Sequence, residues 1–293
     1  MKTHAHFLLA ALLVITHANT AKAATNQDTI TVTGTRFTFP LVQDWIDDFQ
    51  QTHPGTVFRL VSPRDPAAAQ AVIHFTAQRI PQHKEQYQYV AVARYALLPV
   101  TNIHSAHAGK SLTVEHLKEL YFKREQKNTA SEQVVVYNRL EKSCAPVTFA
   151  AFYGAAFEDI KGKQVPGDDQ QLLKAVQEDP AAVSFNNPGF IYDLRNRKPV
   201  HNIAVIPLDL NNNGRLEQEE NFYTDLDVLI NRLETAPPPG IPIEEVVLSY
   251  DRSLEKTQPV IAAWVQYIQR EGQTQLHHFG FLTAHPVNAV ATK

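Results

Sequence analysis

Residues 29–55 carry the sequence TITVTGTRFTFPLVQDWIDDFQQTHPG, within which the hydrophobic period changes once. Residues 29–33 are rich in β-branched side chains and predict a strand. Residues 40–51 place large apolar side chains four positions apart with acidic ones outside, which predicts an amphipathic helix. A strand that passes through a short loop into a helix is the repeating unit of α/β proteins, so this stretch predicts that fold class.

The rest of the chain repeats this alternation. Apolar, β-rich runs are followed by helical stretches with capping residues at their starts, such as Thr113 and the pair Asp168/Asp169. We therefore expect an α/β fold with largely parallel sheets. The expected strands are 57–61, 72–76, 89–100 with a break at Pro99, 134–137, 182–185, 203–208 and 246–249, and the expected helices are 113–122, 146–153, 168–177, 222–233 and 254–270.

The N-terminal segment has the pattern of a secretory leader. Lys2 gives a positive start, residues 7–15 are apolar, and residues 21–23 (AKA) form a small-residue cleavage site. The apolar run is too short to span a bilayer, and no later segment is long and apolar enough to do so. No cysteine lies near the cleavage site for lipid attachment. We expect residues 1–23 to be a signal peptide and the mature chain to be soluble in a bacterial periplasm, neither lipidated nor embedded in the membrane.

Composition excludes several classes of function. The formal net charge of -3 argues against a nucleic-acid partner. Cys144 is the only cysteine, so no intramolecular disulfide can form, and no local signature marks it as a nucleophile. The sequence shows no catalytic triad, zinc motif or cluster of catalytic acids, so we predict that the protein is not an enzyme.

The roughly 270 residues after the leader are enough for two lobes, and we expect a monomer.

Residues 209–220, DLNNNGRLEQEE, fit the calcium loop D-x-[DN]-x-[DN]-G-x5-E at every fixed position. Calcium takes about six to eight oxygen ligands, and this spacing supplies them from one short segment. Because a strand and a helix flank the loop, we expect a structural clamp rather than half of a paired sensor. The alternative is a polar, Asn-rich turn. The expected calcium ligands are Asp209, Asn211, Asn213, the carbonyl of Arg215, Glu217 and Glu220.

Loops that follow strands are the expected place for a ligand. Open α/β sheets bind ligands beyond the carboxyl ends of their strands, and the free N–H groups at helix starts attract anions. Two such junctions also carry an arginine, whose forked guanidinium suits oxyanions. Capping alone explains one junction, but two arginine-bearing junctions favour an oxyanion site. The expected ligand-binding residues are Thr35, Arg36 and Thr38 at the first junction, Arg139 and Ser143 at the second, and Thr76 after a third strand.

Four segments resemble the phosphate-type substrate-binding proteins of bacterial ABC transporters. The resemblance implies a two-lobed periplasmic binding protein fold of class II (a Venus flytrap), with the ligand between the lobes and a membrane permease as partner. It places lobe 1 at 24–93 plus 235–293 and lobe 2 at 94–207, and the EF-hand-like calcium loop makes the chain look like a variant of the family. The segments are TGTRFTFPLVQDWIDDFQQTHPG (33–55), YALLPVTN (95–102), SLTVEHLKELYF (111–122) and KQVPGDDQQLLKAVQEDPAAVSFNN (163–187).

Departures from the family pattern concern the ligand rather than the fold. Arg36 and Phe37 stand where the family usually has small hydroxyl residues. In the second loop Lys142 and Cys144 replace glycines, which restricts close backbone approach to an oxyanion. Gln78 stands where the family often has a carboxylate that accepts the proton of hydrogen phosphate. The fold that the resemblance implies is therefore better supported than the identity of the ligand.

Three functions are compatible with the sequence. The leading hypothesis is a periplasmic protein that captures phosphate or a related small oxyanion for an ABC transporter. A second hypothesis keeps the fold without transport, as a calcium-stabilised module that binds another ligand or a partner protein. The third is a hydrolase acting on a phosphorylated substrate, against which the absence of catalytic motifs argues.

Overall fold

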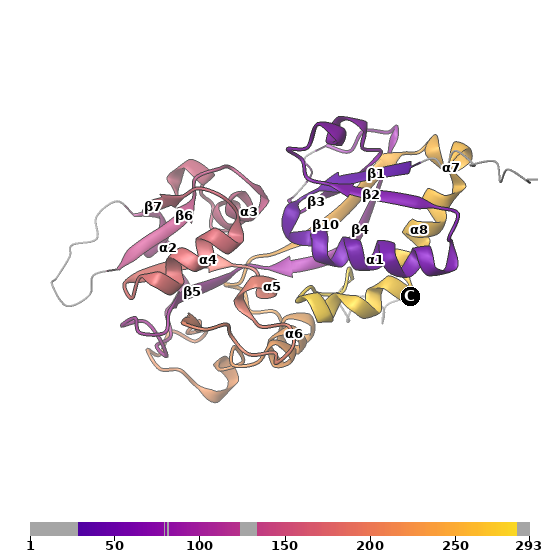
Figure 1. Cartoon of the computed structure of the whole chain (residues 1–293). Helices are drawn as coiled ribbons and strands as arrows, with labels where there is room; N and C mark the ends of the chain where they lie inside the picture. Colours follow the sequence, from indigo (N-terminus) through magenta and orange to yellow (C-terminus); the bar gives the residue numbers. More distant parts are fainter. Residues whose placement is uncertain (1–28, 79, 81, 124–133, 286–293) are drawn as a thin grey trace, which may run out of the picture.

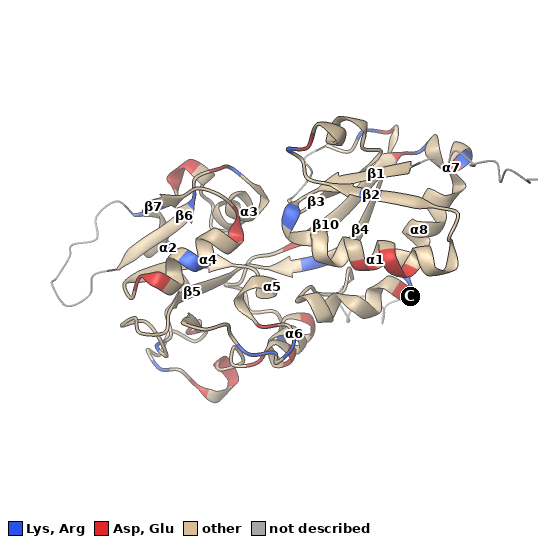
Figure 2. Ribbon diagram, viewed as in Figure 1, with Lys and Arg blue, Asp and Glu red and all other residues tan. Residues whose placement is uncertain are grey.

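The computed structural model describes residues 29–78, 80, 82–123 and 134–285, and it contains two mixed five-stranded sheets, each flanked by helices (Figure 1). The expected signal peptide, 1–23, lies outside the described residues. Within the described part of the chain, no helix has the length and apolar character needed to cross a membrane. Basic and acidic residues occur on both lobes, and neither lobe carries one sign of charge alone (Figure 2).

The first sheet has the order β2-β1-β3-β10-β4. β1, β2 and β3 are parallel, whereas β10 runs antiparallel to both β3 and β4. Its core contains Trp45 of α1 and Trp264 of α8, whose rings both pack near the ring of Phe75 in β3. The strands are β1 (Thr29–Gly34), β2 (Val57–Val61), β3 (Ile73–Thr76), β4 (Tyr87–Ala96) and β10 (Ile243–Asp251), and the helices of this lobe are η1 (Arg36–Thr38), α1 (Phe39–Thr52), η2 (Pro66–Gln70), α7 (Leu254–Thr257), α8 (Pro259–Gln269) and η5 (Glu271–Phe279).

The second sheet has the order β7-β6-β8-β5-β9. β6 is parallel to β7 and β8, and β5 is antiparallel to β8 and β9. Phe149 stacks on Phe185 with ring centroids 3.9 Å apart at the centre of this core. The strands are β5 (Leu98–Asn102), β6 (Val135–Arg139), β7 (Lys163–Val165), β8 (Ala182–Asn186) and β9 (Ile203–Val205), and the helices are α2 (Val114–Phe122), α3 (Cys144–Phe152), η3 (Phe157–Asp159), α4 (Asp169–Glu178), α5 (Pro188–Ile191), η4 (Gln218–Glu220) and α6 (Leu226–Thr235).

The chain crosses between the sheets at Leu97. β4 ends at Ala96 in the first sheet and β5 begins at Leu98 in the second, while the fully buried Leu97 donates its N–H to the carbonyl of Pro242, 2.9 Å away, on the returning crossover. The change of sheet therefore comes after the boundary between 93 and 94 that the resemblance implied. The return into the first sheet comes at Ile243, where β10 pairs with Ala96.

Several sequence-based expectations need correction. The sheets are mixed rather than largely parallel, because the crossover strands β4, β5 and β10 run antiparallel to their neighbours. The extended run 89–100 breaks at Leu97 and not at Pro99, which lies inside β5. The helix expected at 254–270 is interrupted at Gln258, because Pro259 has no N–H to continue it. The predicted caps Thr113 and Asp168 are confirmed, since each side chain accepts a hydrogen bond from the first turn of its helix.

Gly34 brings the end of β1 against β3. Its φ is +152°, and a Cβ at this position would lie 2.3 Å from the carbonyl oxygen of Phe75. The same carbonyl accepts the N–H of Thr35 at 2.9 Å. This close approach fixes the direction in which the chain leaves β1, and with it the position of the loop that follows.

We expect Gly34→Ala to lower the free energy of unfolding by about 1–3 kcal/mol, because the added methyl group meets backbone that cannot move aside easily. Urea denaturation measures the effect. Gly55→Ala is the matched control, since a Cβ there meets nothing within 4 Å. Equal stabilities of the two variants would contradict the role given to the β1–β3 approach.

Candidate ligand-binding cleft

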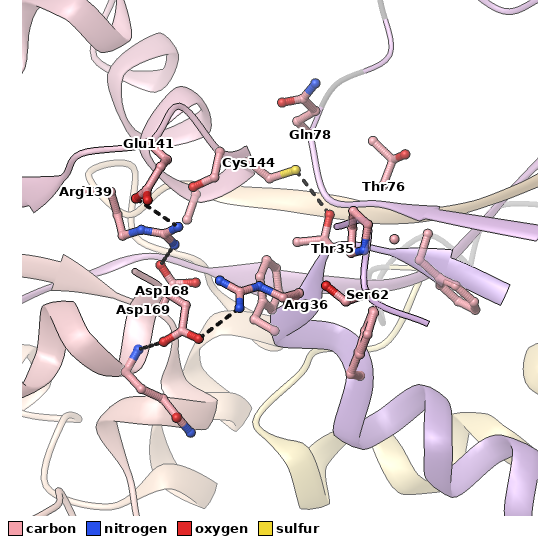
Figure 3. Close-up of a pocket in the computed structure, with 18 of the residues that line it drawn as sticks. Thr35, Arg36, Ser62, Thr76, Gln78, Arg139, Glu141, Cys144, Asp168 and Asp169 are labelled. Atoms are coloured by element: carbon pink, nitrogen blue, oxygen red, sulfur yellow. Dashed lines mark hydrogen bonds and ion pairs between the residues drawn. The ribbon is translucent and has the colours of Figure 1, made fainter. Parts of the chain in front are cut away.

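A cavity of about 660 Å³ lies between the two lobes. The first lobe contributes the loops after β1, β2 and β3, and the second contributes the β6–α3 loop and the start of α4 (Figure 3). All these loops follow the carboxyl ends of strands, which is where α/β sheets bind ligands. Aromatic side chains, including Phe37, Phe75 and Phe190, form part of the wall.

Five of the six residues that the sequence nominated as ligand-binding line this cavity, namely Thr35, Arg36, Thr76, Arg139 and Ser143. The sixth, Thr38, does not line it. Thr38 is fully buried, and its hydroxyl donates to the carbonyl of Thr35 at 2.7 Å. Its role in the structure is to hold the turn that presents Thr35 and Arg36.

Sequence reasoning missed several lining residues. Ser62 and Arg64 follow β2, and the rule used for the other junctions, that ligands bind beyond strand ends, would have found them. Glu141 lies in the second loop beside Arg139, and no sequence pattern marks it as part of a site. Asp168 and Asp169 have the pattern of helix caps, which does not reveal that the helix they begin lies across the cleft from η1.

Arg139 is the most deeply buried cation of the cleft. It ends β6, is 5% exposed, and donates from Nη1 to Asp169 Oδ1 at 3.0 Å. Its buried Nε has no hydrogen-bond partner among the described residues. Burial raises the pKa of the Asp169 carboxyl, and the neighbouring Arg139 opposes that rise. Arg139 therefore forms a buried ion pair with Asp169 and keeps one N–H donor, at Nε, without a partner among the described residues.

The start of α3 offers a second unused polar group. Ser143 occupies the N-cap position of α3 but makes no side-chain capping bond. Its hydroxyl oxygen is buried and has no hydrogen-bond partner in the described parts of the chain. A cap residue normally satisfies a free N–H of the first turn, so an idle hydroxyl beside a cavity is available for a ligand.

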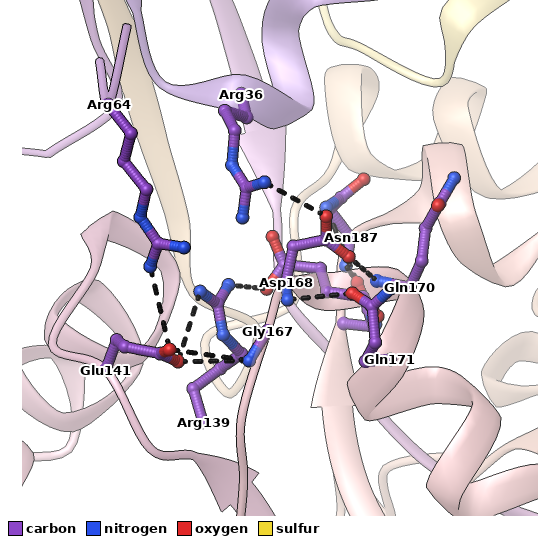
Figure 4. A network of polar contacts seen from close by, with 11 residues as sticks. Arg36, Arg64, Arg139, Glu141, Gly167, Asp168, Gln170, Gln171 and Asn187 are labelled. Carbon is purple, nitrogen blue, oxygen red and sulfur yellow. Dashed lines mark hydrogen bonds and ion pairs between the residues drawn. The ribbon is translucent and has the colours of Figure 1, made fainter. Parts of the chain in front are cut away.

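Among the described residues that line the cavity, three contacts bridge the lobes. Arg36 Nη1 lies 3.4 Å from Asp168 Oδ2, Arg64 Nη2 lies 3.6 Å from Glu141 Oε1, and Thr35 Oγ1 lies 3.2 Å from Cys144 Sγ (Figures 3 and 4). The side chains of Arg36 and Asp168 are 39% and 29% exposed, so water screens the pair and it stabilises the closed arrangement by at most about 1 kcal/mol. These contacts are looser than the buried pair at Arg139.

The calcium-type loop lies apart from the cleft. Asp209 and Glu220, its first and last positions, are both buried, and the four residues between them that were nominated as ligands are exposed. Asp209 accepts the N–H groups of Asn213 and Gly214, and Glu220 accepts those of Leu210 and Glu217. Among the described residues, no three or more His, Cys, Asp or Glu side chains are grouped so that they could hold a metal ion, and the three carboxylates of this loop, Asp209, Glu217 and Glu220, form no such group.

No protein-family model and no curated protein sequence matches the chain. Solved structures do. A phosphate ABC transporter substrate-binding protein with bound phosphate from Clostridium perfringens has a TM-score of 0.64 at 14% identity, over 87% of this chain and 99% of that one. An ABC-type phosphate transport receptor from Vibrio cholerae has a TM-score of 0.60 at 14% identity, with the same coverage. The regulatory domain of a LysR family regulator from N. meningitidis has a TM-score of 0.52 at 8% identity, over 84% of this chain and 94% of that one.

These likenesses, at such low identity, concern the fold. The TM-scores extend over 84–87% of this chain and so include both sheets. The chain has the two-lobed fold of periplasmic substrate-binding proteins.

Proposed function

We propose that the chain is an extracytoplasmic solute-binding protein that captures a small oxyanion, phosphate or a relative of it, and delivers it to an ABC transporter permease. It binds its ligand and does not convert it. The observation that carries the proposal is the pair of unused donors at the cleft, Arg139 Nε and Ser143 Oγ, one on a buried guanidinium and the other at a helix start. The leader-like N-terminus and the fold support the periplasmic setting.

Charge-assisted donors in a partly closed cavity are the usual means of holding an oxyanion. Hydrogen bonds to an ionised group are roughly twice as strong as neutral ones, and a planar guanidinium adds directional specificity. The first turn of α3 adds its N–H groups and the positive end of the helix dipole. Closure of the lobes by hinge motion around Leu97 would cover the bound anion.

The binding test uses isothermal titration with inorganic phosphate, sulfate and related oxyanions. We expect saturable binding, and we expect Arg139→Lys to weaken it at least about tenfold, because lysine keeps the charge but loses the guanidinium fork. The control is Arg59→Lys, since Arg59 is exposed on β2 and does not line the cleft. If no oxyanion binds at millimolar concentration, transport of an oxyanion is ruled out and a binding module for another ligand or a partner protein takes its place.

Arg139 also supports the fold, and this effect is separable from binding. Arg139→Ala leaves the buried carboxylate of Asp169 without its cation, which costs about 3–5 kcal/mol of stability. The pKa of Asp169 is already raised by burial, and removal of the arginine raises it further. In the variant, burial disfavours the ionised form of Asp169 in the folded state. The loss of stability is therefore complete above the raised pKa of Asp169, and it shrinks as the pH falls through that pKa, because the carboxyl group then becomes neutral.

Urea denaturation tests the direction of this pH dependence. Arg139→Ala and the unsubstituted protein are compared at neutral pH and at about pH 5. The stability difference between the two proteins should be smaller at the lower pH. A difference that stays constant, or grows on acidification, would show that Asp169 is not the group left uncompensated.

We also propose that the loop 209–220 binds one calcium ion and clamps the chain between β9 and α6. The donor set fits a hard cation, because it consists entirely of carboxylate, amide and backbone oxygens. The ligands would be Asp209, Asn211, Asn213, the Arg215 carbonyl, Glu217 and Glu220, with an affinity on the order of 10⁻⁴ to 10⁻³ M.

Added calcium should raise the melting temperature, because an ion that binds only the folded chain stabilises it by linkage. Glu220→Gln should remove that rise, since it neutralises the expected bidentate ligand. Glu219→Gln, which changes the exposed neighbour, is the control and should keep it. If the melting curves in calcium and in chelator coincide, the loop binds no calcium and is a polar turn.

A further inference from the structure

The cations of the cleft are matched by carboxylates. Among the described residues, Arg36, Arg64, Arg139 and Lys142 line the cavity together with Glu141, Asp168 and Asp169. Lys142 in turn pairs with Glu158, 2.9 Å away. A doubly charged inorganic anion in this cavity would therefore approach carboxylates as closely as it approaches guanidinium groups, and like charges disfavour it.

The two kinds of ion pair in the cleft differ in how easily a ligand can exchange with them. The buried pair of Arg139 and Asp169 is short, at 3.0 Å. The interlobe pairs of Arg36 with Asp168 and of Arg64 with Glu141 are longer, at 3.4 and 3.6 Å, and their side chains are partly exposed. Charge-assisted hydrogen bonds are normally about 2.7–2.9 Å long, so these interlobe pairs are loose and can open.

The cavity is also larger and less polar than a bare oxyanion requires. Its volume of about 660 Å³ lies within the range of about 300–1,000 Å³ that is typical of sites for organic ligands. Phe37, Phe39, Phe75 and Phe190 contribute apolar wall. Inorganic phosphate has no apolar surface to place against these rings.

We propose that the natural ligand is a small organic oxyanion that also carries an ammonium group. Its anionic end binds at Arg139 Nε and Ser143 Oγ, and its ammonium group binds Asp168 and Glu141, so that the ligand inserts into the loose interlobe pairs and satisfies both signs of charge. The proposal rests on the oxyanion-binding function above and names the class of ligand. Arg36 and Arg64, released from their carboxylates, then face the anionic end.

The test compares 2-aminoethyl phosphate with propyl phosphate, in which a methyl group replaces the ammonium, by isothermal titration near neutral pH. We expect the ammonium compound to bind at least about tenfold more tightly, as a charged hydrogen bond in a partly desolvated site predicts. Asp168→Asn should reduce that preference to less than about threefold, because it removes one of the two carboxylate charges that recognise the ammonium group. Asparagine is as good a helix cap as aspartate, so α4 and the fold should survive the change.

Glu178→Gln is the matched control, because Glu178 is an exposed carboxylate at the far end of the same helix. It should leave the preference for the ammonium compound unchanged. Equal affinities of the unsubstituted protein for the two compounds, or a preference that survives Asp168→Asn, would overturn the proposal. If inorganic phosphate and both organic phosphates fail to bind, the oxyanion function itself is wrong; if phosphate and propyl phosphate bind as tightly as the ammonium compound, only the ligand class is wrong.

Discussion

Leu97 belongs to neither sheet, and its N–H is held by the carbonyl of Pro242, 2.9 Å away. Ala96 and Leu98 on either side of it are fully buried, so the chain passes from one hydrophobic core into the other without an exposed linker. The returning crossover pairs with it and holds the two sheets together at this point. The ends of β1, β3 and β6 then open onto one cavity, and every residue of the cleft depends on that placement.

The parts that local chemistry controls could be predicted from the sequence. The cap Asp168 and a strand at 134–137, which the structure places at Val135–Arg139, could be predicted because hydrophobic period and helix-start chemistry depend on neighbouring residues. The pairing of Arg64 with Glu141 could not be seen, since it joins loops from different lobes and no local pattern records it. Asp168 makes one contact of each kind. One of its carboxylate oxygens caps α4, as the local sequence predicts, and the other faces Arg36 across the cleft, which the local sequence does not reveal.

Two arginines of the cleft form ion pairs that differ in burial. Arg139, at 5% exposure beside Asp169, is part of the core of its lobe, and its removal would leave a buried charge without compensation. Arg36 lies in a partly exposed pair that water screens, so the same chemical contact contributes little there. A buried pair fixes geometry, whereas a loose pair can exchange partners. Arg139 therefore has a defined position in its lobe, whereas Arg36 contributes only a weak contact between the lobes.

The two-lobed fold provides a cleft but does not determine which ligand binds there. Structures similar to this fold include an ABC-type phosphate transport receptor and the regulatory domain of a LysR family regulator, so architecture alone cannot select a ligand. In this chain Gly34 preserves the close approach of β1 to β3, which sets the frame of the first loop. The second loop instead carries Lys142 and Cys144, and three carboxylates share the cavity. The lining therefore presents both signs of charge, and it carries side chains where glycines would leave the backbone open to close approach.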